Sequence, residues 1–149
     1  MINLIKDKIM KKILTILSIL PILAFSGINI EKITHTLSHI KGKKTLYFYN
    51  ANKNIILNNT IKLTPLNRAN IVLFSNKIYK SKVSIVNSYK ELKLNPNSIG
   101  AIYLKKGRTQ IVFVKERLDS HGLVLNLKFK KHIIHEWQLN PTSLINNLK

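Results

Sequence analysis

Ala69–Phe74 (ANIVLF) is the stretch of this sequence that decides the fold, because it forms a near-continuous apolar run. A short run of this kind is typical of a strand that is covered on both faces. Residues 83–86 (VSIV) repeat the pattern further along the chain. After them, Ser88 is a suitable N-cap for a helix over 89–94, which Asn95-Pro96-Asn97 would end. Strands that alternate with helices in this way predict an α/β layered domain.

The next two apolar segments predict a hairpin. Gly100–Leu104 and Gln110–Val114 are expected to be strands, joined by Lys105-Lys106-Gly107-Arg108. We predict a four-residue turn in which Gly107 takes the positive φ. Because a hairpin is antiparallel, the sheet is mixed. The prediction is therefore a single three-layer (α/β/α) domain with a mixed, mostly parallel sheet containing one hairpin.

Weaker signals precede these strands. Apolar residues recur with helical spacing over 28–40, where Asn29 is the predicted N-cap and Gly42 the predicted stop. Residues 45–49 are aromatic and short, as expected of a strand. Residues 52–66 are rich in Asn and predict only a weak helix or an irregular connection.

Helical signals follow the hairpin. Glu116–His121 predicts a helical turn that Gly122 ends. Asn126 is the predicted N-cap of a last helix that runs to about Trp137. We expect the domain to span residues 27–139, followed by a polar tail over 140–149.

The first 26 residues have the organisation of a signal peptide. A Lys-rich start leads into the apolar run Ile13–Phe25, which closes on Ala24-Phe25-Ser26. Small residues at positions 24 and 26 suit a signal peptidase, so cleavage is predicted after Ser26. The run is shorter than the roughly 20 residues that a membrane-spanning helix needs. A periplasmic protein is expected, with an uncleaved inner-membrane anchor as the alternative.

The charge of the chain is strongly positive, with a formal net value of +19. The predicted leader contains four Lys and one Asp, so its removal leaves +16. Lys makes up 22 of the 25 basic residues, whereas nucleic-acid readers depend on Arg forks and exposed aromatic side chains. Nucleic acid is therefore not expected as a partner. Two interpretations stay open: a solvated Lys surface produced by AT-rich codons, or contact with an acidic envelope protein or an acidic membrane surface.

The sequence offers few parts for catalysis. Five carboxylates follow the leader: Glu31, Glu91, Glu116, Asp119 and Glu136. Glu116 and Asp119, beside Lys115 and Arg117, are interpreted as ordinary surface charges. The chain contains no Cys, no Gly-rich phosphate loop and no nucleophile elbow. We expect neither an enzyme nor a resident cofactor.

Histidine gives one metal hypothesis. His35 and His39 have i, i+4 spacing on the first predicted helix, and His132 and His135 lie on the last one. If the two helices pack side by side, these imidazoles could converge on Zn or Cu. Two pairs of solvent-exposed histidines are the competing interpretation.

The predicted turn is the densest basic point outside the leader. Lys105, Lys106 and Arg108 could hold a small anion or an acidic partner. A hairpin tip is also where solvated Lys and Gly are ordinarily found, so both interpretations remain.

A series of short motifs runs from Asn70 to Asn126: IVLFS at 71–75, VSIV at 83–86, IGAI at 99–102, IVFV at 111–114 and HGLVLN at 121–126. Their order, with a basic turn ending in Arg108, resembles the YfiR-like periplasmic regulators. That family has a strand ending in Phe-Ile-Ser, a Gly-Gly-Met-Ile strand, an Arg-x-x-Phe-x-Ile-Asn strand and a helix leading to Ala-Gly-Leu-x-Leu-Ser. The resemblance covers roughly 60 residues, and most of its motifs are structural.

The chain also departs from that family. The family's Cys residues are absent, and its N-terminal Tyr-Asn-Phe helix has only a faint counterpart at Tyr49-Asn50. The resemblance implies an exported module that restrains a membrane-bound diguanylate cyclase by binding its periplasmic part. We therefore expect a non-catalytic binding or regulatory module of the bacterial envelope. The alternatives are a small periplasmic solute- or anion-binding protein and a metal-handling protein.

Overall fold

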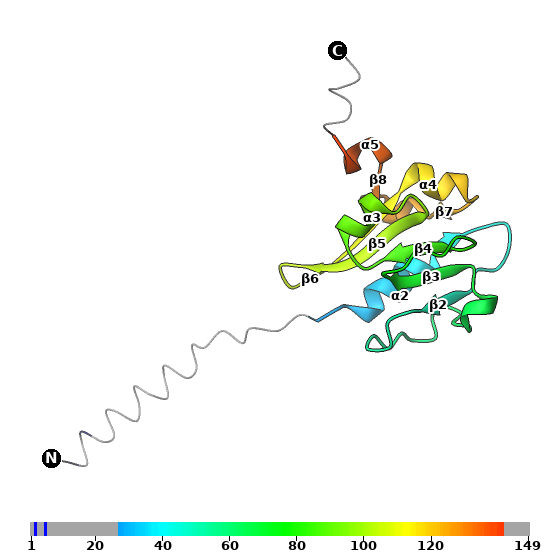
Figure 1. Cartoon of the computed structure of the whole chain (residues 1–149). Helices are drawn as coiled ribbons and strands as arrows, with labels where there is room; N and C mark the ends of the chain where they lie inside the picture. Colours follow the sequence, from blue (N-terminus) through cyan, green and yellow to red (C-terminus); the bar gives the residue numbers. More distant parts are fainter. Residues whose placement is uncertain (1, 3–4, 6–26, 142–149) are drawn as a thin grey trace.

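The computed structural model describes residues 2, 5 and 27–141 (Figure 1). The predicted signal peptide and its cleavage after Ser26 lie outside this part, as does the tail beyond Pro141. Among the described residues, no helix combines the length and hydropathy that crossing a bilayer requires.

One six-stranded sheet forms the centre of the domain, in the order β2-β3-β4-β5-β6-β8. Its strands are β2 (Phe48–Asn50), β3 (Ile71–Ser75), β4 (Val83–Val86), β5 (Ser98–Lys105), β6 (Arg108–Val114) and β8 (Ile133–Ile134). Strands β2 to β5 are mutually parallel, β6 is antiparallel to β5, and β8 is parallel to β6. The predicted α/β fold, with a mixed, mostly parallel sheet and one hairpin, is confirmed. A second, two-stranded sheet pairs β1 (Ile40–Lys41) with β7 (Val124–Leu125).

Short helices connect these strands. They are α2 (Ile30–Ser38), η1 (Leu66–Arg68), α3 (Tyr89–Leu94), α4 (Lys115–Ser120), η2 (Leu127–His132) and α5 (Glu136–Leu139). Two predicted N-caps are confirmed: Asn29 accepts a hydrogen bond from the backbone N–H of Lys32, and Ser88 from that of Glu91. Helix α2 ends at Ser38, earlier than predicted, because the chain then turns into β1.

The core consists of two apolar clusters on either side of the sheet. In β6, Ile111 and Phe113 belong to the first cluster, while Val112 and Val114 belong to the second. Alternate residues of a strand point to opposite faces, which explains the division. Helix α2 contributes Ile33 and Leu37 to the first cluster; α3 and α5 contribute Leu92 and Leu139 to the second. Helices therefore pack in both clusters, while an arrangement in three full layers stays a prediction.

The predicted last helix, from Asn126 to Trp137, is wrong. Asn126 caps a helical segment as expected, accepting a hydrogen bond from the N–H of Lys128, but that segment is the 3₁₀ helix η2. The chain then extends as β8, which adds to the edge of the sheet beside the end of β6. Two consecutive β-branched residues, Ile133 and Ile134, suit this extended pairing better than a helix.

The predicted four-residue turn is also wrong in length. Lys105 and Arg108 are paired across the hairpin, which leaves a two-residue turn. Its residues, Lys106 and Gly107, have φ values of 50° and 71°. Positive φ at both central positions is what a type I′ hairpin turn requires, and Gly107 meets this without steric cost.

Candidate functional site

The far end of the β5–β6 hairpin is the candidate site. The last pair that β4 makes with β5 joins Val86 to Ala101, whereas the β5–β6 ladder continues to Lys105 and Arg108. The hairpin therefore projects past its neighbour in the sheet, as Figure 1 shows. We call residues 103–110 the basic arm.

The three cations predicted at this site all lie at the tip of the basic arm. Lys105, Lys106 and Arg108 are exposed and line, with Gln110, a hollow of about 310 Å³. Within the described part of the chain, none of the three forms an ion pair with a carboxylate. Leu104, which precedes Lys105 in β5, is 48% exposed. The tip therefore offers unneutralised positive charge next to an apolar side chain.

The basic arm is fixed to the start of α2 through Thr109, which follows Arg108 in β6. The hydroxyl oxygen of this buried residue accepts a hydrogen bond from the backbone N–H of Asn29, at 2.7 Å. Its carbonyl oxygen accepts one from the Nζ of Lys32, at 2.9 Å. The chain therefore enters the domain beside the arm, and Lys32 adds a fourth positive charge nearby.

The four histidines of the metal hypothesis do not converge. The rings of His35 and His39 are 4.8 Å apart, and each also packs against Phe129. His132 stacks on that same phenyl ring at 6.4 Å, but His135 lies beyond β8 and pairs with Glu116 instead. Within residues 27–141, no three potential metal ligands form a group. The hypothesis placed His132 and His135 on one helix, and β8 separates them.

His132 is the buried member of this group. Its Nδ1 donates a hydrogen bond to the carbonyl oxygen of Ile111, at 3.0 Å. Burial lowers the pKa of His132; the Ile111 carbonyl opposes this shift, and the positive charges of Lys32 and Lys131 add to it. The imidazole is therefore held in its neutral form as part of the core.

Glu116 joins α4 to the start of α5. Its Oε1 lies 2.8 Å from the Nδ1 of His135, and its Oε2 accepts a hydrogen bond from the backbone N–H of Glu136, at 2.9 Å. The hydrogen bond from His135 is the main reason that the pKa of Glu116 lies below its usual range. The carboxylate thus occupies the N-terminal end of α5, where negative charge is favourable.

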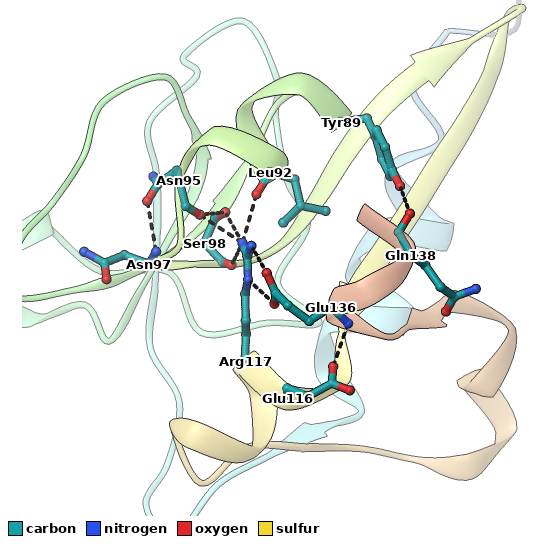
Figure 2. Close-up of polar contacts among 9 residues, drawn as sticks. All are labelled: Tyr89, Leu92, Asn95, Asn97, Ser98, Glu116, Arg117, Glu136 and Gln138. Atoms are coloured by element: carbon teal, nitrogen blue, oxygen red, sulfur yellow. Dashed lines mark hydrogen bonds and ion pairs between the residues drawn. The ribbon is translucent and has the colours of Figure 1, made fainter. Parts of the chain in front are cut away.

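Arg117 was mentioned in the sequence only as a neighbour of Glu116 and Asp119, and no role was predicted for it. It is buried, and its Nη1 donates to the carbonyl oxygens of Leu92, Asn95 and Ser98, each at 2.9 Å (Figure 2). Its Nε and Nη2 donate to the two carboxylate oxygens of Glu136, at 2.8 and 2.6 Å. Carbonyl groups at the C-terminal end of a helix lack hydrogen-bond donors within the helix. The guanidinium of Arg117 is the donor for such carbonyl groups at the end of α3.

A compositional signal could have identified Arg117. Only three of the 25 basic residues are Arg, so each position that keeps Arg in so Lys-rich a chain is informative. Lys has no planar fork with which to bind a carboxylate and several carbonyls at once. Lys115 and Asp119, by contrast, form an exposed pair at 2.7 Å, as expected of surface charges.

Comparison with protein-family models gives no match for this chain, and comparison with curated proteins gives none either. The resemblance to the YfiR-like regulators therefore stays a prediction.

Proposed function

We propose that this protein is an exported, non-catalytic binding module of the bacterial cell envelope, which contacts an acidic partner through the basic arm. The leader-like first 26 residues support export. The resemblance to YfiR-like regulators suggests a membrane signalling protein as the partner. The observation that carries the proposal is the gathering of Lys105, Lys106 and Arg108 on a projecting hairpin.

The arm combines two kinds of contact that interfaces use. Its unpaired cations would attract an acidic partner and speed the encounter. Leu104, which precedes Lys105 in β5, also exposes an apolar side chain that can be buried against that partner. Arg108 adds a planar fork that can bind a carboxylate or phosphate in two places at once.

The carboxylates of Glu116 and Glu136 support a role without catalysis. Glu116 accepts hydrogen bonds from His135 and from the backbone of Glu136, while Glu136 is bound to Arg117. Each of these side chains is engaged in joining helices. A general base needs a free position toward a substrate, and these acids are committed to the fold.

The alternative is a small periplasmic solute- or anion-binding protein that uses the same cations. The hollow at the arm supports it, with a volume near the lower end of the range for ligand pockets, about 300–1,000 Å³. However, one hairpin provides all of its lining residues. The parallel strands also follow each other in chain order, without the reversal that opens a ligand crevice in α/β sheets. Both features favour a partner surface over an enclosed solute.

Co-sedimentation with right-side-out inner-membrane vesicles tests the proposal. The triple variant Lys105→Gln/Lys106→Gln/Arg108→Gln should bind about tenfold more weakly than the wild type at low salt, because unpaired charges dominate the encounter. Protease treatment of the vesicles before mixing distinguishes a protein partner, whose binding is lost, from the lipid surface.

A matched control removes the same charge elsewhere. Lys90, Lys93 and Lys130 are exposed and lie off the arm. Their triple change to Gln should leave binding close to wild type. Equal loss in both triples would show a non-specific charge effect and contradict the proposal. A thermal shift with phosphate that the arm variant abolishes, without vesicle binding, would favour the solute-binding alternative.

A further inference from the structure

We infer that the segment 42–46, which we call the 42–46 loop, forms with its surroundings a binding site for an anionic amphiphile. The site is separate from the basic arm, since it lies where strands β2, β3 and β4 begin, whereas the arm extends from the opposite end of the sheet. The inference does not depend on the function proposed for the arm.

Two hollows flank the 42–46 loop, each of about 450 Å³. The first lies between this loop, the end of α2 and residues 60–62. The second lies on the other side of the same loop, against the beginnings of β3 and β4 and against Leu123. Both volumes fall within the range of ligand pockets, about 300–1,000 Å³.

The first hollow has a cationic rim. Lys41, Lys43, Lys44 and Lys62 line it, and neither hollow has an acidic residue in its lining. Among the described residues, none of these lysines forms an ion pair. The rim is therefore positively charged with no carboxylate at hand to neutralise it.

The floor beneath this rim is apolar. Leu37, Ile40, Phe48 and Ile61 line the first hollow and belong to the first core cluster. In the second hollow, Leu46 and the core residue Leu123 provide the corresponding surface. Of these side chains only Leu46, which lines both hollows, is partly exposed. A small inorganic anion would leave it in contact with water, and an uncharged lipid would leave the lysines unpaired. A negative head with an aliphatic tail satisfies both parts.

Gly42 keeps the 42–46 loop close to the body of the domain. A Cβ atom there would lie 3.1 Å from a methyl carbon of Leu123 and 3.4 Å from one of Leu46. Gly42 lines both hollows. The close approach therefore leaves only the 42–46 loop itself as the wall between them.

Calorimetric titration of the full chain with octanoate, decanoate, acetate and 1-octanol, all below micelle concentrations, tests the site. Decanoate should bind more tightly than octanoate, by up to about fourfold for each added methylene. Acetate and 1-octanol, which lack the tail and the charge respectively, should each bind about tenfold more weakly than octanoate, or worse. Acetate binding as tightly as decanoate would overturn the inference. A lack of binding by all of these probes, and also by the lipid vesicles described below, would overturn it as well.

Two double variants with the same charge change locate the site. Lys43→Gln/Lys44→Gln should weaken decanoate binding about tenfold. Lys105→Gln/Lys106→Gln, on the basic arm, should leave it unchanged. Equal loss in both doubles would overturn the inference. Because the proposed function is tested by vesicle co-sedimentation of the arm triple and this site by decanoate binding, failure of one proposal is distinguishable from failure of the other.

The amphiphile could be free in solution or part of a membrane. Phosphatidylcholine vesicles with and without phosphatidylglycerol separate these sources. Binding of soluble decanoate that depends on Lys43 and Lys44 supports a free amphiphile. Binding only to vesicles that contain phosphatidylglycerol, with the same dependence, supports a membrane lipid. Vesicle binding that ignores both lysines, with no decanoate binding, would contradict the site.

Discussion

His132 lies where η2 meets β6, and its surroundings make a pH-dependent contribution to stability. Burial depresses its pKa below the usual value of 6.5. Above that pH the imidazole is neutral in the folded and unfolded chains alike, so His132 titration does not change the free energy of unfolding. As the pH falls below about 6.5, the unfolded chain takes up the proton first, and stability decreases until the folded pKa is passed.

Thermal unfolding at about pH 7.5 and about pH 5.5 measures this contribution. His132→Asn keeps an N–H that can donate to the Ile111 carbonyl but does not titrate, so its melting temperature should fall less than that of the wild type. The depressed pKa of Glu116 acts only in more acidic solution, outside this window. Equal falls in the two proteins would contradict the assignment of a neutral, buried His132.

At the scale of elements, Arg117 on α4 connects the end of α3 to α5. Arg117→Met would leave the carbonyl oxygens of Leu92, Asn95 and Ser98 without this donor and Glu136 without its cation. Because Glu136 is half exposed and can be hydrated, we expect a loss of about 3 kcal/mol in the free energy of unfolding. Urea denaturation measures it.

Lys115→Met provides the control, since this residue lies on the same helix and has the same charge. Its pair with Asp119 is exposed on both sides, so its removal should change the free energy of unfolding by about 0.5 kcal/mol or less. If Arg117→Met costs no more than Lys115→Met, the guanidinium does not hold the three helices together.

The elements that the sequence predicted well are those with local signals. Val83–Val86 and the helix that follows Ser88 have the predicted bounds, because the apolar run, the N-cap and Asn95-Pro96 lie next to one another in the chain. Residues 126–137 were predicted wrongly because β8 depends on pairing with Phe113 and Val114, about 20 residues earlier. Helical spacing alone contains no information about that partner.

Some single residues could not be predicted either, because their conformation or role depends on distant parts of the chain. Phe74 takes a φ of 54° at an irregularity between β3 and β4, which places both Leu73 and Phe74 in the first core cluster. A bulky residue in this region of φ is rare, so no local rule predicts it. The partners of Arg117 are 19 to 25 residues away, and its role likewise depends on tertiary structure.

In the candidate site too, the residues predicted correctly are those that lie close together in the sequence. Lys105, Lys106 and Arg108 were predicted together because a hairpin tip is a local feature, and the structure brings them together. The four histidines required His132 and His135 to share one helix; η2 does pack on α2 through Phe129, but β8 separates His135 from the others. The hollows at the 42–46 loop were not foreseen, since they join segments that are up to about 80 residues apart.

For the molecule as a whole, the contact at Thr109 places the entry of the chain next to the basic arm. If the leader is cleaved, the arm is free to meet a partner in the periplasm. If it remains as an anchor, the same contact keeps the arm near the membrane surface. If the protein is exported as we propose, both outcomes would place the positive charge of the arm where acidic envelope components are found.

Site-specific photo-crosslinking in living cells tests this account most directly. A benzophenone amino acid in place of Leu104, on the arm, should give adducts with an envelope component. The same group in place of Leu127 should give few, although Leu127 is 82% exposed and Leu104 only 48%. Adducts that follow exposure instead of position, or that form with cytosolic proteins, would contradict an exported module that binds through its basic arm.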